Sequence, residues 1–211
     1  EHTHYVVNVM RLKRGSNLNF FNKSGEWLSE IIFLDRDRVE VKFLDKIKEP
    51  TVISNIELAI CLVKKTPMET ILQKATELGV SKIVPIISDR TEIKELNFER
   101  ANKIVIEAIE QSNQMSPPEI SKVIKLKNYI EALESKILFF ADVNSSNKLE
   151  PKSFKSGVTN CILIGPEGDF SLSEIEKSLQ KGYTPITLGK ARLRTETAAL
   201  VSVMNVSFIN Q

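Results

Sequence analysis

The feature that most constrains the fold of this chain is a change in hydrophobic pattern near residue 56. Before it, short runs rich in aromatic and β-branched residues are separated by turn sequences, which is typical of antiparallel strands. After it, near-continuous apolar runs alternate with helical patterns, which indicates buried parallel strands joined by helices. We therefore expect a β-rich domain at residues 1–52 and an α/β domain with a mainly parallel sheet at residues 53–211.

The β-rich part is expected to form a small antiparallel barrel or meander. Its predicted strands are Tyr5–Met10, Leu18–Phe21, Trp27–Leu34 and Val39–Leu44. The stretch Lys46–Pro50 is the expected linker. A unit of about 50 residues is near the lower size limit for independent folding, so we expect it to depend on the rest of the chain.

The α/β part has five predicted strands and five predicted helices. The strands are Leu58–Val63, Ile83–Ile87, Ile137–Phe140, Thr159–Ile164 and Ile186–Leu188. Four helices are predicted from their caps, which are Thr66 with Pro67 and Glu69, Asn97, Ser171 with Glu174, and Thr195. The fifth is a short helix at Tyr129–Leu133. Pro85 predicts an edge position or a bulge for its strand. The last helix is apolar on nearly all sides, which predicts burial in the domain or in a subunit interface.

Composition excludes several classes of site. The net charge of +2 does not by itself indicate a nucleic-acid binder. His2 and His4 are the only histidines, so the C-terminal part has neither a Ser-His-Asp system nor a His/Cys zinc cluster. Cys61 and Cys161 lie in apolar runs, which favours buried reduced thiols in a cytoplasmic protein. No segment approaches the roughly 20 apolar residues that span a membrane, and no signal peptide is visible.

Two loops near the end of the chain are the candidate functional site. Residues 164–171 and 188–197 each follow a predicted strand and precede a predicted helix, where ligands of α/β proteins bind. The first loop matches no phosphate-binding motif, and Glu167 and Asp169 would repel a phosphate. It is either a plain tight turn or a cradle for a neutral or cationic ligand that carries an adenosine.

The second loop has the opposite charge. Lys190, Arg192 and Arg194 precede a helix N-terminus, where positive charge is unfavourable. Either Arg194 pairs with Glu196 or another carboxylate, or the cluster binds an anion such as an RNA phosphate. The two loops together indicate a small organic cofactor that meets a nucleic-acid substrate.

Five motifs in order resemble one known family. They are Thr76–Val80, Ser88–Thr91, Glu110–Ser112, Ile164–Gly168 and Leu193–Ala198. Together they resemble the bacterial 16S ribosomal RNA (uracil-N(3))-methyltransferase family of the SPOUT superfamily, and the resemblance covers nearly the whole chain. It implies a small PUA-like RNA-binding β-barrel followed by a trefoil-knotted, mainly parallel methyltransferase domain. It also implies S-adenosylmethionine as methyl donor, 16S ribosomal RNA of the small subunit as substrate, and a homodimer.

The resemblance assigns site residues by motif. The implied cofactor contacts are Leu138, Phe139, Phe140, Gly165, Pro166, Glu167, Gly168, Leu188, Gly189, Leu193 and Ala198. The expected catalytic residues are Arg194, which would stabilise the uracil anion, and Glu196, which would orient the uracil or help to remove its proton. The expected RNA contacts are Arg11, Lys13, Arg90, Lys190 and Arg192. No metal is expected.

The chain departs from the family pattern at two places. Asn113-Gln114 stands where relatives usually carry Gly-Arg, and Ala191-Arg192 stands where they usually carry Arg followed by Ile or Val. The sequence leaves two alternatives open. One is a SPOUT methyltransferase for transfer RNA or a ribose oxygen, and the other is a non-catalytic protein that binds RNA or assists ribosome assembly.

Overall fold

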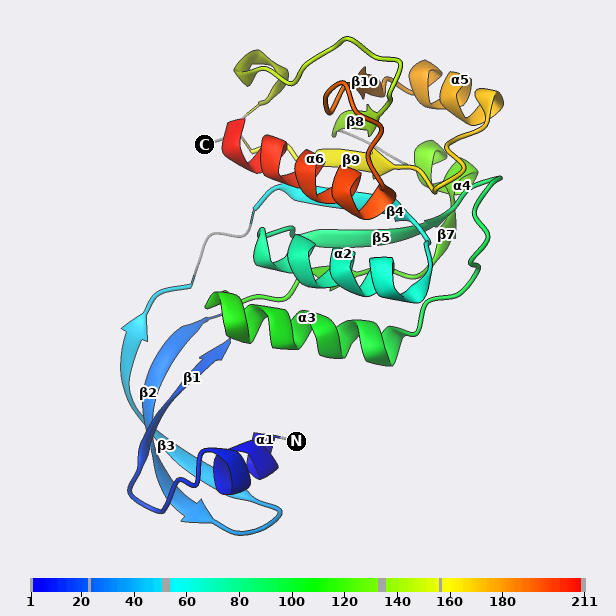
Figure 1. The fold of residues 1–211 in the computed structure, drawn as a ribbon. Helices are drawn as coiled ribbons and strands as arrows, with labels where there is room; N and C mark the ends of the chain where they lie inside the picture. Colours follow the sequence, from blue (N-terminus) through cyan, green and yellow to red (C-terminus); the bar gives the residue numbers. More distant parts are fainter. Residues whose placement is uncertain (1, 23, 51–53, 133–135, 156, 210–211) are drawn as a thin grey trace. The chain divides into compact units, whose positions relative to one another are not determined.

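The computed structural model describes residues 2–22, 24–50, 54–132, 136–155 and 157–209. The chain divides into two compact units, Glu1–Val52 and Ile53–Gln211 (Figure 1). The described part of the first unit contains an antiparallel sheet, and that of the second contains a larger parallel sheet.

The first unit has a three-stranded meander in the order β1-β2-β3. Its strands are β1 (Asn17–Asn22), β2 (Gly25–Leu34) and β3 (Val39–Lys48). The predicted strands at these places are confirmed, but the expected linker begins too early. Lys46 and Lys48 pair with Trp27 and Glu26 of β2, because β3 continues three residues into the segment that the sequence assigns to a linker.

The predicted strand Tyr5–Met10 is wrong. The chain instead forms a short helix α1 (His2–His4) followed by the π-helical turn η1 (Tyr5–Val9). The backbone N–H of Met10 donates to the carbonyl of Tyr5 at 2.9 Å, and that of Leu12 donates to Val6 at 3.1 Å. These local bonds replace a ladder, so the β-branched composition of the segment does not decide its conformation.

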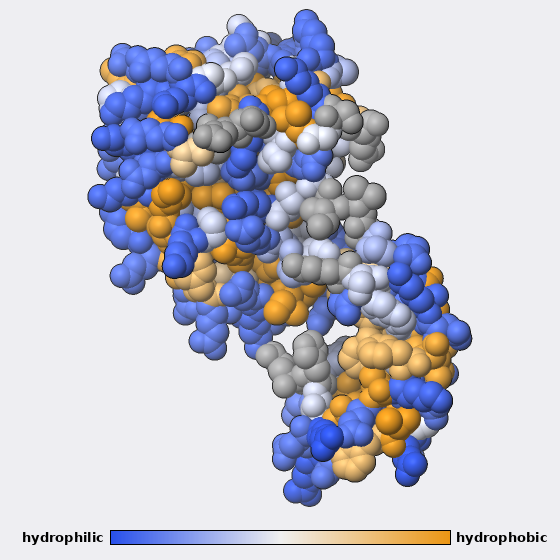
Figure 2. Space-filling model, turned by 180° about the vertical axis from the view of Figure 1, so that it is seen from behind, coloured by the Kyte–Doolittle hydropathy of each residue, from blue (hydrophilic) through white to orange (hydrophobic). Residues whose placement is uncertain are grey.

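The first unit buries few apolar side chains. Among its described residues, Val6 and Ile31 are the buried hydrophobic ones. Apolar side chains lie instead on the surface of this unit (Figure 2), and the exposed ones on β2 and β3 are Ile32, Phe33, Phe43, Leu44 and Ile47. This small core agrees with the size limit on a unit of about 50 residues.

The second unit contains a sheet in the order β10-β8-β9-β4-β5-β6, and β7 also pairs with β5. Its strands are β4 (Ile56–Cys61), β5 (Lys82–Ile87), β6 (Glu119–Ile120), β7 (Ile124–Lys125), β8 (Ile137–Ala141), β9 (Asn160–Ile164) and β10 (Thr184–Ile186). Every pairing in this sheet is parallel. The carboxyl ends of the strands therefore share one edge, where the loops of the candidate site lie.

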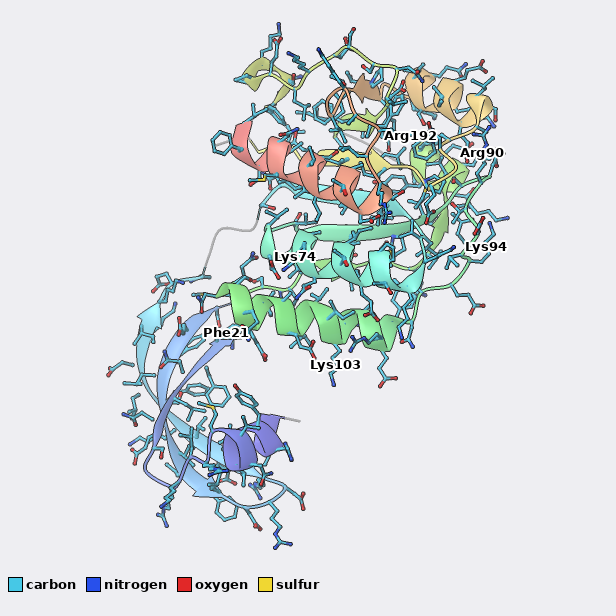
Figure 3. All side chains as sticks on the ribbon, in the orientation of Figure 1. Phe21, Lys74, Arg90, Lys94, Lys103 and Arg192 are labelled. Carbon is cyan, nitrogen blue, oxygen red and sulfur yellow. The ribbon has the colours of Figure 1, made fainter. Side chains whose placement is uncertain are left out.

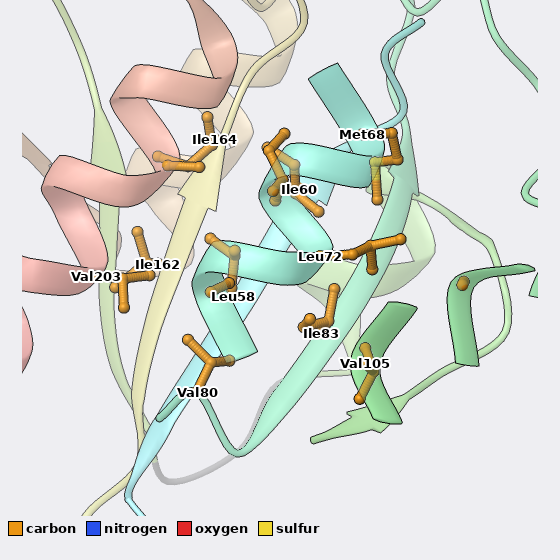
Figure 4. Packing of buried hydrophobic residues seen from close by; sticks show 14 of the residues in the cluster. Leu58, Ile60, Met68, Leu72, Val80, Ile83, Val105, Ile162, Ile164 and Val203 are labelled. Carbon is orange, nitrogen blue, oxygen red and sulfur yellow. The ribbon is translucent and has the colours of Figure 1, made fainter. Parts of the chain in front are cut away.

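Helices enclose this sheet in two apolar layers. They are α2 (Lys65–Glu77), α3 (Phe98–Ser112), α4 (Leu126–Glu131), α5 (Leu172–Gln180) and α6 (Thr195–Ile209), with the 3₁₀ turn η2 (Pro151–Ser153). On β4, Leu58 and Ile60 pack into the layer that contains α2, α3 and α6 (Figure 4), whereas Ala59 and Cys61 pack into the layer with α4. Strict alternation on a fully buried strand is the reason for its continuous apolar sequence.

Two of the predicted helix caps are confirmed. Asn97 accepts a hydrogen bond from the backbone N–H of Arg100, and Ser171 forms a reciprocal capping box with Glu174. The predicted Thr66 cap is wrong, because α2 begins at Lys65 and its N-cap residue Lys64 makes no side-chain cap.

Pro85 occupies neither an edge nor a bulge. β5 lies between β4 and the two short strands β6 and β7, and Pro85 is buried opposite Ile60. On its other side, β6 pairs with residues 82–83 and β7 pairs with residues 86–87, so that the ladder is interrupted at residues 84–85. A residue without an N–H is tolerated there because the neighbouring strand is itself broken.

The first departure from the family pattern has a structural explanation. Asn113 ends α3 in the left-handed conformation with φ 54°, which Asn tolerates better than other non-glycine residues. The Gln114 amide donates at 2.8 Å to both Thr76 O and Glu77 O, two carbonyls in the last turn of α2. The pair Asn113-Gln114 therefore ends one helix and caps another.

Both cysteines are free and buried, and they should resist alkylation in the native protein. Burial raises the pKa of the Cys61 and Cys161 thiols from 9.0 to about 12. At pH 8.5 we expect labelling by iodoacetamide to be at least about 100-fold slower in the native state than in urea, because the thiolate is the reactive form. Above pH 9 the unfolded thiols ionise while the folded thiols stay protonated, so native stability should fall as pH rises. Fast native labelling of either cysteine would contradict the buried placement.

Candidate functional site

A cleft of about 540 Å³ opens at the carboxyl edge of the parallel sheet. Four connections form its walls, and they follow β4, β8, β9 and β10. The lining residues are Lys64, Pro67, Ala141, Asp142, Val143, Ile164, Gly165, Pro166, Glu167, Asp169, Leu188, Gly189, Ala191, Arg192, Leu193, Arg194, Thr195, Glu196 and Ala198. Both loops singled out from the sequence thus meet in one cavity, and its volume lies within the range of small-molecule sites.

The β9–α5 loop turns tightly beneath the cleft. The N–H of Asp169 donates to Pro166 O at 2.9 Å, and Asp169 itself has a φ of 65°. A Cβ atom at Gly165 would lie 3.2 Å from the ring of Phe170, which is buried. The absence of a side chain at Gly165 therefore lets the backbone approach the Phe170 ring closely and leaves the cleft open.

The loop before α6 presents its cations to the other side of the cleft. Gly189 has a φ of 124°, a conformation that side chains rarely adopt. The Arg194 carbonyl accepts a bond from Ala198 N–H at 2.8 Å, so Arg194 occupies the position that the sequence assigns to a Thr195 cap. Thr195 is instead the first helical residue and is buried.

Arg194 is free to face a ligand. Its side chain is exposed, and the ion pairs within the described ranges do not include one between Arg194 and Glu196 or any other carboxylate. The alternative in which Arg194 serves only as a structural partner of Glu196 is therefore not observed. Figure 3 places Arg192 on the same loop, beside the strand ends.

The walls of the cleft carry charges of both signs. Glu167 and Asp169 come from the β9–α5 loop, Asp142 from the end of β8, and Glu196 from the first turn of α6. The cations Lys64, Arg192 and Arg194 line the same cavity. A group of carboxylates favours a cationic ligand, whereas two arginines at the N-terminus of α6 favour an anion beside it. Such a cleft suits a positively charged small molecule that reacts with an anionic group.

The structure brings most of the predicted site residues together. Those that line the cleft are Gly165, Pro166, Glu167, Leu188, Gly189, Arg192, Leu193, Arg194, Glu196 and Ala198. Gly168, Lys190 and Arg90 belong to the same unit but do not line the cleft, and Arg11 and Lys13 belong to the other unit.

Leu138, Phe139 and Phe140 do not line the cleft, so their assignment as cofactor contacts stays a prediction. All three residues pair with β9 inside the sheet, and both phenylalanines are buried. From this part of the chain, the cleft is lined by residues 141–143, which lie at the carboxyl end of β8.

Several lining residues were not among the site residues assigned from the sequence, although Asp169 lies in a loop that the sequence singles out. They include Lys64, Pro67, Asp142 and Asp169. Each belongs to the connection or the helix that follows the carboxyl end of a strand, so the rule for parallel sheets could have indicated them once the strand order was known.

Two negative findings concern the described ranges. No helix there is long and apolar enough to cross a membrane. No group of three or more His, Cys, Asp or Glu side chains in those ranges could hold a metal ion.

Comparisons with known proteins agree with this architecture. Residues 48–207 match an RNA methyltransferase domain, and residues 1–44 match an RNA methyltransferase PUA domain. The fold expected from the sequence, a small antiparallel unit followed by a mainly parallel α/β domain, is confirmed.

Two relatives illustrate the likeness. Ribosomal RNA small subunit methyltransferase E of Rickettsia conorii is 32% identical over 213 residues, which cover 99% of this chain and 87% of the relative. The solved structure of the Neisseria gonorrhoeae protein of that name, bound to S-adenosyl methionine, is 27% identical with a TM-score of 0.87 and covers 99% of this chain and 89% of the other.

These matches define the class of the protein as an RNA methyltransferase. More narrowly, the chain belongs to the ribosomal RNA small subunit methyltransferase E family. The trefoil knot implied by the sequence resemblance stays a prediction.

Proposed function

We propose that this protein transfers a methyl group from S-adenosylmethionine to the N3 atom of a uracil in 16S ribosomal RNA. The observation that carries the proposal is the meeting of the acidic β9–α5 loop and the arginine-bearing loop before α6 in one cleft. Membership of the small subunit methyltransferase family supports the substrate class, and the cofactor bound to the Neisseria gonorrhoeae relative supports the donor.

The residues present fit such a cofactor. The cleft volume of about 540 Å³ accommodates a molecule of this size. Gly165, Pro166 and Glu167 would hold it from one side, and Leu188, Gly189, Leu193 and Ala198 from the other. The carboxylates of Asp142, Glu167 and Asp169 suit its positive charge. When bound, the cofactor supplies an electrophilic methyl group on a sulfonium.

The chain's own residues prepare the nucleophile. The N3 atom of uracil lies between two carbonyl groups and must lose its proton before it can attack. Arg194 would stabilise the resulting anion electrostatically, because its guanidinium carries no carboxylate partner among the described ion pairs. Glu196, half-buried in the first turn of α6, would orient the base or accept its proton.

Exposed cations would hold the RNA. Arg192 lines the cleft and Lys190 is exposed on the same loop, so both are placed to meet phosphates beside the reacting base. Arg11 and Lys13 are exposed between η1 and β1 of the small unit and would also contact RNA. We propose the unit at residues 1–52 as an RNA-binding domain on this basis.

The outer side of α6 supports a homodimer. Val203 and Val206 are fully buried against the sheet, whereas Met204 is 58% exposed and Phe208 is 76% exposed. A helix that is apolar on both sides needs a second partner, and we propose a second copy of this chain at that face. Action on ribosomal subunits would place the enzyme in the cytoplasm.

Calorimetry with S-adenosylhomocysteine tests the enzyme proposal. We expect stoichiometric binding to the purified protein, because the reaction product fills the same cleft as the donor. A protein that only binds RNA would need no such site. Undetectable binding at millimolar ligand would therefore overturn the proposed function.

A further inference from the structure

The loop after β5 and the loop after β9 are joined by a set of hydrogen bonds outside the cleft lining. The Arg90 guanidinium donates from Nη1 to Gly168 O at 2.9 Å. The Ser171 hydroxyl donates to Asp89 Oδ2 at 2.7 Å. These bonds span more than 75 positions of sequence and fasten the back of the loop that forms the floor of the cleft.

Glu174 is the buried centre of this connection. Its side chain is 7% exposed, and each of its two oxygens accepts a bond from a different loop. Oε1 accepts from the backbone N–H of Asp89 at 2.8 Å, and Oε2 accepts from that of Ser171 at 2.9 Å. A capping box needs only the second of these bonds. The first bond therefore gives Glu174 a role beyond the end of its own helix.

The loop that these bonds hold has an uncommon backbone conformation. Asp169 lies in the left-handed region, which is uncommon for residues other than glycine and which Asp tolerates better than most. Gly168, the residue before it, packs directly on Arg90, since a Cβ atom at 168 would be 3.4 Å from the Cβ of Arg90. Arg90 thus contacts the loop both through its guanidinium and through its aliphatic stem.

The loop after β5 is itself well fixed. The Thr91 hydroxyl accepts from the Ser88 N–H at 3.0 Å and bonds to the Ser88 hydroxyl at 2.8 Å, and both residues are buried. Lys94 donates to the carbonyl of Thr91. Hydrogen bonds to this fixed loop hold the β9–α5 loop in one conformation. Such preorganisation of a binding site lowers the entropy lost when a ligand binds.

We propose that Arg90, Asp89 and Glu174 are positioning residues that hold the β9–α5 loop in its cofactor-binding shape. The sequence assigned Arg90 as an RNA contact. In this proposal Arg90 instead affects the affinity for the cofactor, through its bond to Gly168. Figure 3 places Arg90 near the start of α5, in accord with its bond to the β9–α5 loop. This inference rests on the proposed cofactor site.

Two variants with matched controls test whether Arg90 and Glu174 position the β9–α5 loop. Arg90→Gln removes the guanidinium, and Glu174→Gln removes one of two accepting oxygens without changing size. The controls are Lys127→Gln, an exposed cation on α4, and Glu176→Gln, an exposed carboxylate on the same helix as Glu174. Thermal unfolding of each variant shows whether it folds. Because Arg90 is exposed, Arg90→Gln should fold and still test the proposal even if Glu174→Gln does not fold.

For Arg90→Gln we expect S-adenosylhomocysteine to bind about tenfold more weakly, the loss expected for a charge-assisted hydrogen bond. The affinity for RNA, measured with saturating S-adenosylhomocysteine, should stay within about twofold of that of the unmodified protein. The same holds for kcat at saturating S-adenosylmethionine. Arg90→Lys should restore part of the affinity, because a lysine can still donate to Gly168 O. The two control variants should bind both ligands normally.

The opposite pattern would overturn the inference. If Arg90→Gln weakens RNA binding while leaving the affinity for S-adenosylhomocysteine unchanged, Arg90 is an RNA contact and the loop holds its shape without it. Failure of the unmodified protein to bind S-adenosylhomocysteine is a separate result, and it would overturn the proposed function together with this inference.

Discussion

Arg194→Ala should lower kcat by at least about 100-fold, the loss typical of removing one group that stabilises a developing anion. The affinity for S-adenosylhomocysteine should change by less than about twofold, because the variant keeps the backbone of the loop and the apolar contacts of Leu193 and Ala198. Single-turnover methylation of small-subunit RNA measures the first quantity, and calorimetry measures the second.

Two further variants make this prediction specific. Arg194→Lys keeps a positive charge but not the planar guanidinium, so it should recover only part of the rate. Lys181→Ala removes an exposed cation beyond α5 and should leave the rate unchanged. A parallel loss of cofactor affinity in Arg194→Ala would mean that Arg194 holds the cofactor rather than the uracil anion.

Gly165→Val should abolish detectable binding of S-adenosylhomocysteine, a loss of at least about 100-fold for a side chain that fills a ligand site. The Cβ atom alone would lie 3.2 Å from Phe170 Cε2, and the two methyl groups must then displace the ring or enter the cleft. Calorimetry measures the affinity, and near-ultraviolet circular dichroism reports whether the aromatic packing is kept.

A graded series separates the loss of the site from the loss of the fold. Gly165→Ala needs a shift of only a few tenths of an ångström and should bind more weakly than the unmodified protein but more tightly than Gly165→Val. Normal cofactor affinity in a folded Gly165→Val protein would show that the ligand does not lie against this loop.

The sequence predicted the elements whose bonds are local or whose burial is complete. The capping box at Ser171 and the cap at Asn97 need only neighbours within three positions, so they follow from residue type alone. The apolar run of β4 is equally clear, because both faces of a central parallel strand are covered.

Elements decided by distant partners could not be predicted in this way. Tyr5–Met10 has strand-like composition but pairs with no strand, and local carbonyls receive its N–H groups. Pro85 is tolerated because the strand beside it is broken, which its own sequence does not reveal. Within the site, Asp142 and Lys64 were not assigned to the cleft, because only the strand order brings them to the same edge as residues 164–169.

The most direct test of uracil N3 methylation is methyl transfer to small ribosomal subunits from cells that lack the gene. The subunits are incubated with the protein and methyl-labelled S-adenosylmethionine, and the nucleosides of 16S ribosomal RNA are analysed by mass spectrometry. We expect label in 3-methyluridine, strongly reduced with Arg194→Ala. Label in a ribose methyl group instead, or no label although the protein binds RNA, would contradict the proposed reaction.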